Sequence, residues 1–297
     1  MIENRIFWLA GFYDGEGSSS FSQGSPSLNI VNSDPKCCAF CLEVFRENGI
    51  IAKLGERSFP SKTKKRSRKR WDLFINQAVE AEKASILLSR YSQGKNAQMT
   101  LIQRYMNKRK GSNRFNILMK FLNQTNNIVI YDIDVLQEKL KLKINSKNIM
   151  LAENEDNLKI TTNNFNQLDY LAGIFDAEGN IGINKRKNKH RDSDRYTPIC
   201  SIVNTNKMIV EAICSTLKNN NIGFHIQQRQ GRNRSRWDIS ISGVKRNIAF
   251  LNLISNKLIS KREQAEILHT YVKQRIKDPY CINDIGHAYK EAIESLR

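Results

Sequence analysis

An internal repeat constrains the fold of this chain more than any other feature of its sequence. Residues Trp8–Gly17 read WLAGFYDGEG, and residues Tyr170–Gly179 read YLAGIFDAEG, at an offset of 162 positions. Further along the chain, Trp71-Asp72 matches Trp237-Asp238 at an offset of 166. A small change of offset places insertions in loops and leaves the helices and strands intact. The chain therefore holds two copies of one unit of roughly 100 residues.

The repeat divides the chain into four parts. The linker between the two copies is rich in asparagine and is expected to hold one helix, near residues 135–142. The extension after the second copy is expected to form a short packing helix that begins near His287. The boundaries are residues 1–110 for the first repeat unit, 111–166 for the linker, 167–277 for the second repeat unit and 278–297 for the C-terminal extension.

Each copy shows the same order of expected elements. The repeated segment is predicted to be a helix that ends at a glycine, the usual residue after a helix C-terminus. Alternation of apolar and polar residues, as in Trp237–Ser242, then predicts strands joined in hairpins. Asp34 before Pro35, and Asn206 in the second copy, are typical helix caps and predict helices that end near residues 48 and 220. Two more helices close each unit, over residues 79–91 and 95–109, and over 245–257 and 261–276.

These patterns predict an α+β fold that is built twice. Helices are expected to cover the apolar face of an antiparallel sheet in each unit, and a polar face of the sheet is left open.

The charge of the chain predicts a polyanionic partner. Lys and Arg number 48 and Asp and Glu 29, so the formal net charge is +19. Nucleic acid is the leading candidate partner, and an anionic membrane surface is the alternative. No apolar run approaches the ~20 residues that span a bilayer, and Met1–Phe7 is too polar for a secretory signal. We therefore expect an intracellular protein. Its richness in Asn, Ile and Lys is typical of an AT-rich genome such as that of a mitochondrion or chloroplast.

The cysteines are predicted to be packing residues. Cys37 and Cys41 align with Ile209 and Ile213 of the second copy, and free cysteine behaves as a small hydrophobic residue. Cys38 and Cys41 form a C-x-x-C pair, but no second pair follows at the spacing of a zinc site. Disulfides are not expected in an intracellular protein.

Two acidic residues close each copy of the repeated helix. Asp14 and Glu16 stand in the first copy, and Asp176 and Glu178 stand at the matching positions of the second. A helix C-terminus carries partial negative charge, so carboxylates there are unfavourable unless a cation offsets them. If only one copy is considered, the alternative is that these acids are ordinary solvated carboxylates near a helix end. Their duplication at matching positions favours a hard divalent cation such as Mg²⁺.

Small residues in the repeated helix predict a close helix–helix contact. If the two helices pack about a pseudo-two-fold axis, Glu16 and Glu178 lie side by side at its end. Paired metal ions can then stabilise the attacking and leaving oxygens of a phosphodiester displacement. The small residues are Ala10, Gly11 and Gly15 in one copy and Ala172, Gly173 and Ala177 in the other.

The two repeated segments resemble the paired motifs of single-chain LAGLIDADG homing endonucleases. The resemblance covers roughly residues 5–110 and 167–277 and is specific, because the motif is matched twice with agreement downstream. It implies two αββαββα units whose motif helices form the central interface and whose sheets form a saddle over DNA. It also implies a monomer that serves intron homing by making a staggered break across the minor groove of a long DNA target.

The resemblance further implies roles for individual residues. Glu16 and Glu178 would bind the catalytic metal, with the carbonyls of Gly15 and Ala177 as additional ligands. Asp14 and Asp176 would support the helix ends instead. The metal would be Mg²⁺ or another divalent cation such as Mn²⁺, and Ca²⁺ would be a non-catalytic substitute. The basic residues expected near the scissile phosphates are Lys95 and Lys261, for which a solvated lysine at a helix start is the alternative.

The predicted DNA contacts lie in the hairpins. Basic clusters between alternating strands are expected to contact phosphates, and polar residues on the open face are expected to read base edges in the major groove. For any individual basic residue, the alternative of equal weight is that it lies in a solvated loop and contacts no DNA. The predicted residues are Ser18, Ser20, Ser22, Lys62, Lys64, Lys65, Arg66, Arg68, Arg70, Asp72, Asn76, Asn180, Asn184, Lys185, Arg186, Lys187, Arg229, Arg232, Arg234, Arg236, Asp238 and Ser240.

Two other functions compete with a metal-dependent DNA endonuclease. One is an RNA-binding maturase that helps an intron fold, alone or alongside endonuclease activity. The other is a DNA-binding regulator that kept the fold and lost the chemistry. Loss of the last motif acid would favour either alternative, but Glu16, Glu178 and both lysines are present. The sequence therefore favours the endonuclease, with double-stranded DNA as partner and intron RNA as the alternative.

Overall fold

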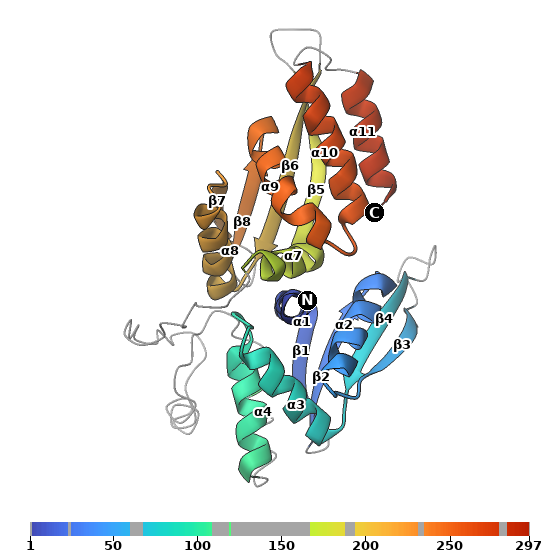
Figure 1. Cartoon of the computed structure of the whole chain (residues 1–297), viewed down its shortest axis with the longest axis vertical. Coiled ribbons are helices and arrows are strands. Elements are labelled where there is room, and N and C mark those ends of the chain that lie inside the picture. The colour runs from blue at the N-terminus through green and yellow to red at the C-terminus, as the bar shows by residue number, and fades with distance from the viewer. Residues whose placement is uncertain are drawn as a thin grey trace.

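The computed structural model shows two units of the same architecture, stacked along the long axis of the molecule (Figure 1). The linker helix expected near residues 135–142 lies outside the described residues. Those residues are 2–22, 25–59, 68–108, 119, 167–187, 194–230, 235–278 and 284–296.

Within the described residues, the first unit contains one four-stranded antiparallel sheet and four helices. The strand order in the sheet is β1-β2-β4-β3. Its elements are α1 (Ile2–Glu16), β1 (Gly17–Ser22), β2 (Ser25–Asn32), α2 (Pro35–Glu47), β3 (Lys53–Phe59), β4 (Arg68–Ile75), α3 (Ala78–Ser89) and α4 (Asn96–Lys108).

The second unit repeats this order and adds a final helix. The strand order is β5-β6-β8-β7, which matches the first sheet strand for strand. Its elements are α7 (Gln167–Glu178), β5 (Gly179–Lys187), β6 (Asp194–Asn204), α8 (Lys207–Asn219), β7 (His225–Gln230), β8 (Ser235–Ser242), α9 (Val244–Ile254), a 3₁₀ turn (Ser255–Lys257), α10 (Arg262–Lys277) and α11 (Asp284–Ser295). The predicted α+β fold, with its two αββαββα units, is confirmed.

The caps predicted from the sequence set the starts of α2 and α8. The Asp34 side chain accepts a hydrogen bond from the Lys36 amide, and Pro35 occupies the first turn of α2. Asn206 accepts from the amides of Met208 and Ile209 at the start of α8. Each cap satisfies backbone donors that a helix N-terminus otherwise leaves unpaired, so the two helices begin where the sequence predicts.

The two motif helices, α1 and α7, pack directly against each other between the two sheets (Figure 1). A Cβ atom added at Gly11 would lie 2.2 Å from the carbonyl oxygen of Tyr170, and one added at Gly173 would lie 2.0 Å from that of Trp8. Only glycine therefore permits this approach of the two backbones. The predicted close contact of the motif helices is confirmed.

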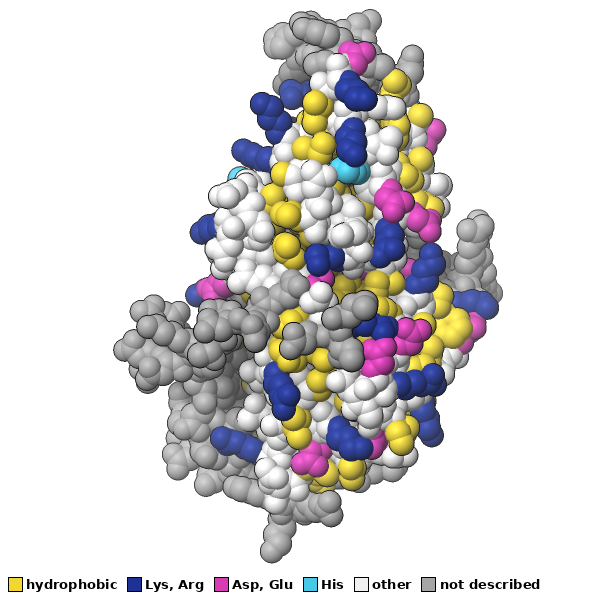
Figure 2. All heavy atoms as spheres, viewed as in Figure 1, with side chains coloured by type: hydrophobic (Ala, Val, Ile, Leu, Met, Phe, Trp, Pro, Cys, Tyr) yellow, Lys and Arg dark blue, Asp and Glu magenta, His cyan; other side chains and the backbone are white. Residues whose placement is uncertain are grey.

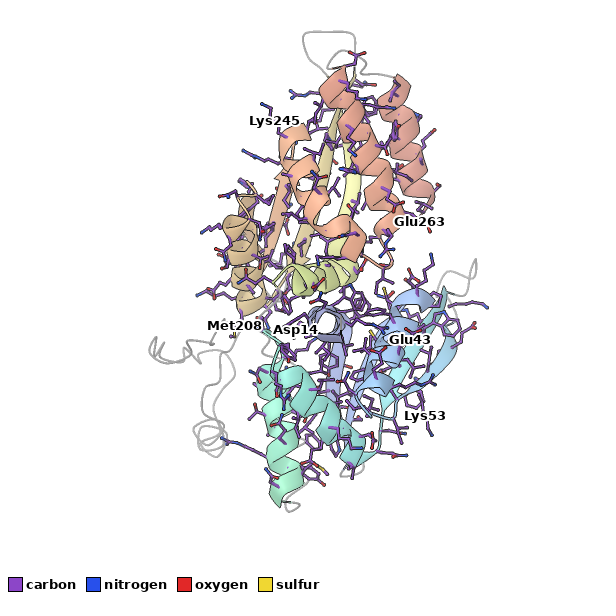
Figure 3. All side chains as sticks on the ribbon, in the orientation of Figure 1. Asp14, Glu43, Lys53, Met208, Lys245 and Glu263 are labelled. Carbon is purple, nitrogen blue, oxygen red and sulfur yellow. The ribbon has the colours of Figure 1, made fainter. Side chains whose placement is uncertain are left out.

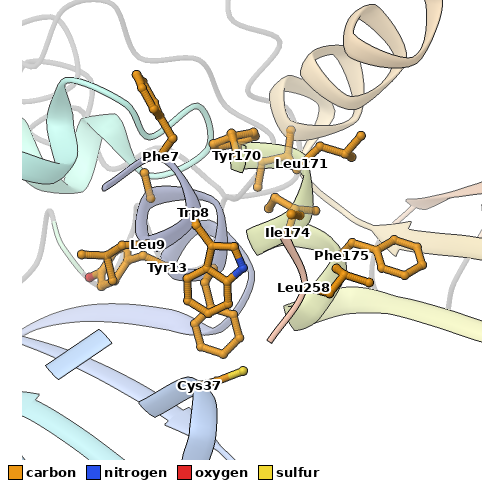
Figure 4. Packing of buried hydrophobic residues seen from close by; sticks show 14 of the residues in the cluster. Phe7, Trp8, Leu9, Tyr13, Cys37, Tyr170, Leu171, Ile174, Phe175 and Leu258 are labelled. Atoms are coloured by element: carbon orange, nitrogen blue, oxygen red, sulfur yellow. The ribbon is translucent and has the colours of Figure 1, made fainter. Parts of the chain in front are cut away.

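The core extends from this helix pair into both units. Trp8, Leu171 and Ile174 are buried around the helix crossing, and Phe175 and Leu258 continue the packing into the second unit (Figure 4). The closing helix α11 packs on α10 and β5, with Ile293 fully buried. No helix in the described ranges has the length and apolar character needed to cross a membrane.

The cysteines lie in this core, as predicted. Cys37, Cys38, Cys41 and Cys200 are buried, and Cys214 is partly buried; all five are free thiols. Cys281 lies outside the described residues.

Each sheet has one face turned to the helices and one open face. In β4, Leu73 and Ile75 are buried under the helices, and the alternating Arg70 and Asn76 are exposed. The same alternation places Ile239 and Ile241 of β8 in the core. The alternation in the sequence does not fix the phase of β2, and the structure assigns it. Ser27 and Asn29 of β2 pair across the sheet with Ser20 and Ser18 of β1, so they lie on the open face.

Candidate active site and nucleic-acid interface

The two motif helices end in glutamates that lie near each other at the centre of the molecule. Glu16 and Glu178 are the last residues of α1 and α7. A Cβ at Gly15 would lie 2.4 Å from the Ala177 Cβ and 3.3 Å from the Glu178 Cγ, so the two helix ends touch. Loss of solvation raises the pKa of both glutamates, and the charge of Glu16 raises that of Glu178 further.

One side-chain hydrogen bond orients Glu16. Nδ2 of Asn32, the last residue of β2, donates to its Oε1 at 3.0 Å. Asn32 was not predicted as a site residue. The available signal was its repetition as Asn204, which is 9% exposed and lines the same central region.

Lys95 and Lys261 reach the ends of the same helices. Nζ of Lys95 donates to the carbonyls of Tyr13 at 2.8 Å and Gly17 at 2.5 Å, and Nζ of Lys261 donates to the carbonyl of Asp176. Burial lowers the pKa of Lys95 to about 8 and also lowers the pKa of Lys261. Although each lysine precedes its own helix, its ammonium lies at the negative end of a motif helix, where a cation is favourable.

Asp14 and Asp176 anchor loops. Oδ2 of Asp14 accepts from the amides of Gln93 and Gly94, at 2.7 and 3.0 Å. Asp176 accepts from the amides of Ile259 and Lys261, also at 2.7 and 3.0 Å. These donors offset the carboxylates at the helix ends without any cation, so the electrostatic argument for a metal applies only to the two glutamates.

A pocket of about 240 Å³ opens beside the two helix ends. Asp14, Lys95 and Glu178 contribute charged groups to its wall, and Asn204 and Asn206 contribute amides. In Figure 3, Asp14 lies at the junction of the two units, near the start of α8. The pocket therefore collects polar groups from both copies of the repeat.

The residues present fit a hard divalent cation. The donors at the two helix ends are the carboxylates of Glu16 and Glu178 and backbone carbonyls of the last helical turn, where Gly15 and Ala177 lie. Oxygen donors of this kind suit Mg²⁺, Mn²⁺ or Ca²⁺, which take their remaining ligands from water or substrate. Within the described part of the chain, no three His, Cys, Asp or Glu side chains gather into a metal cluster. The chain therefore offers two carboxylates, and a bound cation would need carbonyl, water or phosphate oxygens besides.

Many of the predicted DNA-contacting residues that the structure describes lie on the open faces. In the first sheet these are Ser18, Ser20, Arg70 and Asn76, and in the second they are Asn180, Asn184, Arg186, Arg229, Arg236 and Ser240. In the view of Figure 2, basic side chains are spread over the surface with acidic ones between them.

Apart from Asp72 and Asp238, the remaining predicted residues divide into two groups. Lys185 forms an ion pair with Asp194 at 2.7 Å and lies near the ring of Tyr196, in the strand phase of β5 opposite to that of Asn184 and Arg186. Lys187 is exposed and, two residues further along β5, belongs to the same face of the strand as Lys185. The structure does not describe Lys62, Lys64, Lys65, Arg66, Arg232 and Arg234, nor the side chains of Ser22 and Arg68.

Asp72 and Asp238 occupy matching positions on the two open faces, each paired with arginine. Nε of Arg57 lies 2.7 Å from Asp72, and Nε of Arg229 lies 2.7 Å from Asp238. The Asp72 side chain is only 5% exposed, whereas that of Arg57 is 65% exposed. The arginines therefore present the accessible groups. Arg57 was not predicted, because its place beside Asp72 depends on the register of β3 with β4, in which Gly55 pairs with Asp72.

The architecture defines the class of the chain. It has the fold of the single-chain LAGLIDADG endonucleases, with two αββαββα units joined through paired motif helices, as the sequence resemblance implies. No protein-family model matches the chain, and no curated protein sequence matches it either.

Particular solved structures share this fold over nearly the whole chain. I-SmaMI bound to an uncleaved DNA target in the presence of calcium ions superposes with a TM-score of 0.65 and 11% identity, covering 98% of this chain and 97% of the other. The LAGLIDADG meganuclease I-AabMI bound to uncleaved DNA gives 0.60 and 15%, covering 98% of both chains. The LAGLIDADG homing endonuclease I-GzeII in complex with its DNA target gives 0.62 and 13%, covering 98% and 97%.

Proposed function

We propose that this chain is a site-specific DNA endonuclease that makes a staggered double-strand break with the help of a divalent metal ion. The observation that carries the proposal is the pair of glutamates at the touching ends of α1 and α7, with one partly buried lysine beside each helix end. The structural neighbours are DNA-bound endonucleases of the same fold, which supports duplex DNA as the substrate.

The two halves of the centre suit the two strands of a duplex. Lys95 of the first unit lines the central pocket with Glu178 of the second. The charge of Lys261 offsets the burial-raised pKa of Glu16 more than the charge of Lys95 does, so each strand can meet one acid and one lysine. A divalent cation held by Glu16 and Glu178 would supply Lewis-acid stabilisation of the charge that develops on the phosphate.

The lysines are placed to act on the phosphate directly. A lysine ammonium has three donors, and Lys95 uses two of them on the carbonyls of Tyr13 and Gly17. The third donor can bind a phosphate oxygen and stabilise negative charge there. The fixed contacts to the helix end hold the ammonium in place before substrate binds.

The open sheet faces would hold the DNA on both sides of this centre. Arginines such as Arg70 and Arg236 can contact phosphates, and serine and asparagine side chains of the strands can contact base edges. Such binding weakens steeply as the salt concentration rises, because each phosphate contact releases counterions.

The test begins by selecting a target. Purified protein is incubated with a randomised duplex DNA library and Mg²⁺, cleaved molecules are sequenced, and the cut positions on both strands are mapped. Repeating the selection with Mn²⁺ and with Ca²⁺ tests the metal requirement. We expect staggered cuts at one long site with Mg²⁺ or Mn²⁺, and binding without cutting with Ca²⁺.

Glutamine variants then test the centre. Glu16→Gln and Glu178→Gln should each reduce double-strand cleavage by about a hundredfold or more, while DNA binding persists. The matched control is Glu211→Gln, because Glu211 lies on the exposed face of α8 and contacts only Lys207 among the described ion pairs. Undiminished cutting by either centre variant would overturn the assignment of the two glutamates.

A further inference from the structure

Each motif helix donates one hydrogen bond from an aromatic side chain to the aspartate of the other motif helix. Nε1 of Trp8 in α1 donates to Oδ2 of Asp176 in α7 at 3.1 Å. The hydroxyl of Tyr170 in α7 donates to Oδ2 of Asp14 in α1 at 2.7 Å. Trp8 and Tyr170 occupy matching positions of the repeat, and all four side chains are at most 3% exposed. The two bonds thus cross the same buried interface in opposite directions.

Each aspartate in turn holds the loop that leads to a lysine of its own unit. Asp14 accepts from the hydroxyl of Ser92 at 2.5 Å and from the two following amides, and the amide of Lys95 donates to the Ser92 hydroxyl at 3.0 Å. Asp176 accepts from the hydroxyl of Ser260 and from the amide of Lys261, both at 3.0 Å. The backbone of each lysine is therefore fixed by the aspartate to which the opposite helix donates.

We propose that Trp8 and Tyr170 are positioning residues that act across the interface, so that Trp8 sets the lysine of the second unit and Tyr170 sets the lysine of the first. Each aspartate carboxylate accepts from four described donors, and their geometry decides where the carboxylate points. Loss of the aromatic donor leaves the carboxylate free to rotate within its buried site, and the loop amides that it holds lose their alignment. The effect appears in the unit that does not carry the substitution.

The packing around the aromatics allows a clean substitution. The Trp8 ring stacks on Phe12 with centroids 4.8 Å apart and meets Phe40 edge-on at 4.9 Å. Phenylalanine at position 8 keeps an aromatic ring in this place and removes the donor together with part of the indole ring, so the Trp8→Tyr variant serves as its control for volume. Phenylalanine at position 170 removes only the hydroxyl.

Hydrogen exchange of the metal-free full-length chain tests the proposal without any substrate. Tyr170→Phe should raise amide exchange about tenfold or more at residues 93–95 and leave residues 259–261 unchanged, since one hydrogen bond to a charged group is lost. Trp8→Phe should do the reverse. Equal changes in both loops for both variants, or a change confined to the substituted unit, would overturn the proposal.

Exchanging the natural donors supplies the matched control. Trp8→Tyr and Tyr170→Trp each place at one position the donor that the chain itself uses at the other. Both should keep the exchange of the opposite loop within about threefold of the unsubstituted protein, well below the change expected for the phenylalanine variants. If these variants loosen the opposite loop as much as the phenylalanine variants do, packing and not the donor is responsible, and the proposal fails.

Cleavage of the two DNA strands gives a second measurement, which rests on the proposed function. With each strand of the selected target labelled separately, Trp8→Phe should slow cleavage of one strand and Tyr170→Phe should slow cleavage of the other. Equal slowing of both strands by both variants would overturn the assignment of one lysine to each strand. If the unsubstituted protein cuts no DNA, the proposed function fails, whereas the exchange measurement still decides the positioning role.

Discussion

The substitution of Gly11 by alanine tests the central helix contact most directly. An alanine Cβ would lie 2.2 Å from the Tyr170 carbonyl oxygen, whereas ordinary contacts begin near 3.4 Å, so α1 and α7 must separate by about 1 Å. Neither side can yield by rotating a side chain, because the obstacle is backbone. A radial gap of this size forfeits a large part of the dispersion energy along the interface.

The expected loss of stability follows from three contributions. Overpacking lowers the free energy of unfolding by about 1–3 kcal/mol. The higher helix propensity of alanine raises it by up to about 1 kcal/mol. Separation also weakens the two buried hydrogen bonds that Trp8 and Tyr170 donate across the interface, each worth about 1.5–3 kcal/mol because the acceptor is charged. We expect a net loss of about 3 kcal/mol, which for a chain of this size lowers Tm by about 6 °C or more.

Scanning calorimetry of the purified chain provides the measurement. The control is Gly55→Ala, because a Cβ at Gly55 would meet only the Phe74 ring, at 3.8 Å. That variant should lie within about 0.5 kcal/mol of the unsubstituted protein, as expected away from special features. Gly173→Ala, with its Cβ 2.0 Å from the Trp8 carbonyl oxygen, should behave as Gly11→Ala does. A stable Gly11→Ala variant would refute the close helix contact.

Three further predictions follow from the site and the core. Burial lowers the pKa of Lys95 to about 8, below the ~10.4 of an unfolded lysine, so the cost of burying its charge is relieved as pH rises from about 8 to 10. Denaturation melts should therefore show that Lys95→Met loses about 2 kcal/mol relative to the unsubstituted protein over that range; a constant difference would contradict the lowered pKa. Asp72→Asn should release Arg57 and weaken DNA binding about tenfold, measured by titration of labelled target; unchanged binding would remove Arg57 from the interface. Ile293→Ala should cost about 2–4 kcal/mol in calorimetry, because the side chain is fully buried; a neutral result would show that α11 does not pack as described.

The charged side chains at the centre show where sequence reasoning succeeded and where it stopped. Two acids at each helix end predicted bound divalent metal, and the family resemblance assigned the aspartates a supporting role without naming their partners. The structure separates the roles, because the amides of Gln93, Gly94, Ile259 and Lys261 satisfy the aspartates and leave the glutamates. These amides come from loops about 80 residues away in the chain, so no local pattern could have assigned them.

The open sheet faces show the same division. Period-two alternation placed Arg70, Asn76 and Arg236 on the open face, since a buried apolar face fixes the strand register. The alternation could not show that Asp72 is covered by Arg57, because that pair depends on the registry of β3 with β4. It also could not show that Lys185 pairs with Asp194, because that pair depends on the register of β5 with β6.

The sequence by itself determined that this protein is one unit built twice, with helices, strands and caps where local patterns predict them. Capping, alternation and glycine positions act over a few residues, so they can be read from the chain directly. The tertiary structure alone decided which donors satisfy which acids, because hydrogen bonds such as Trp8 to Asp176 join residues 168 positions apart. Such contacts form only when α1 and α7 meet, and the glycines that permit this meeting do not reveal which side chains cross it.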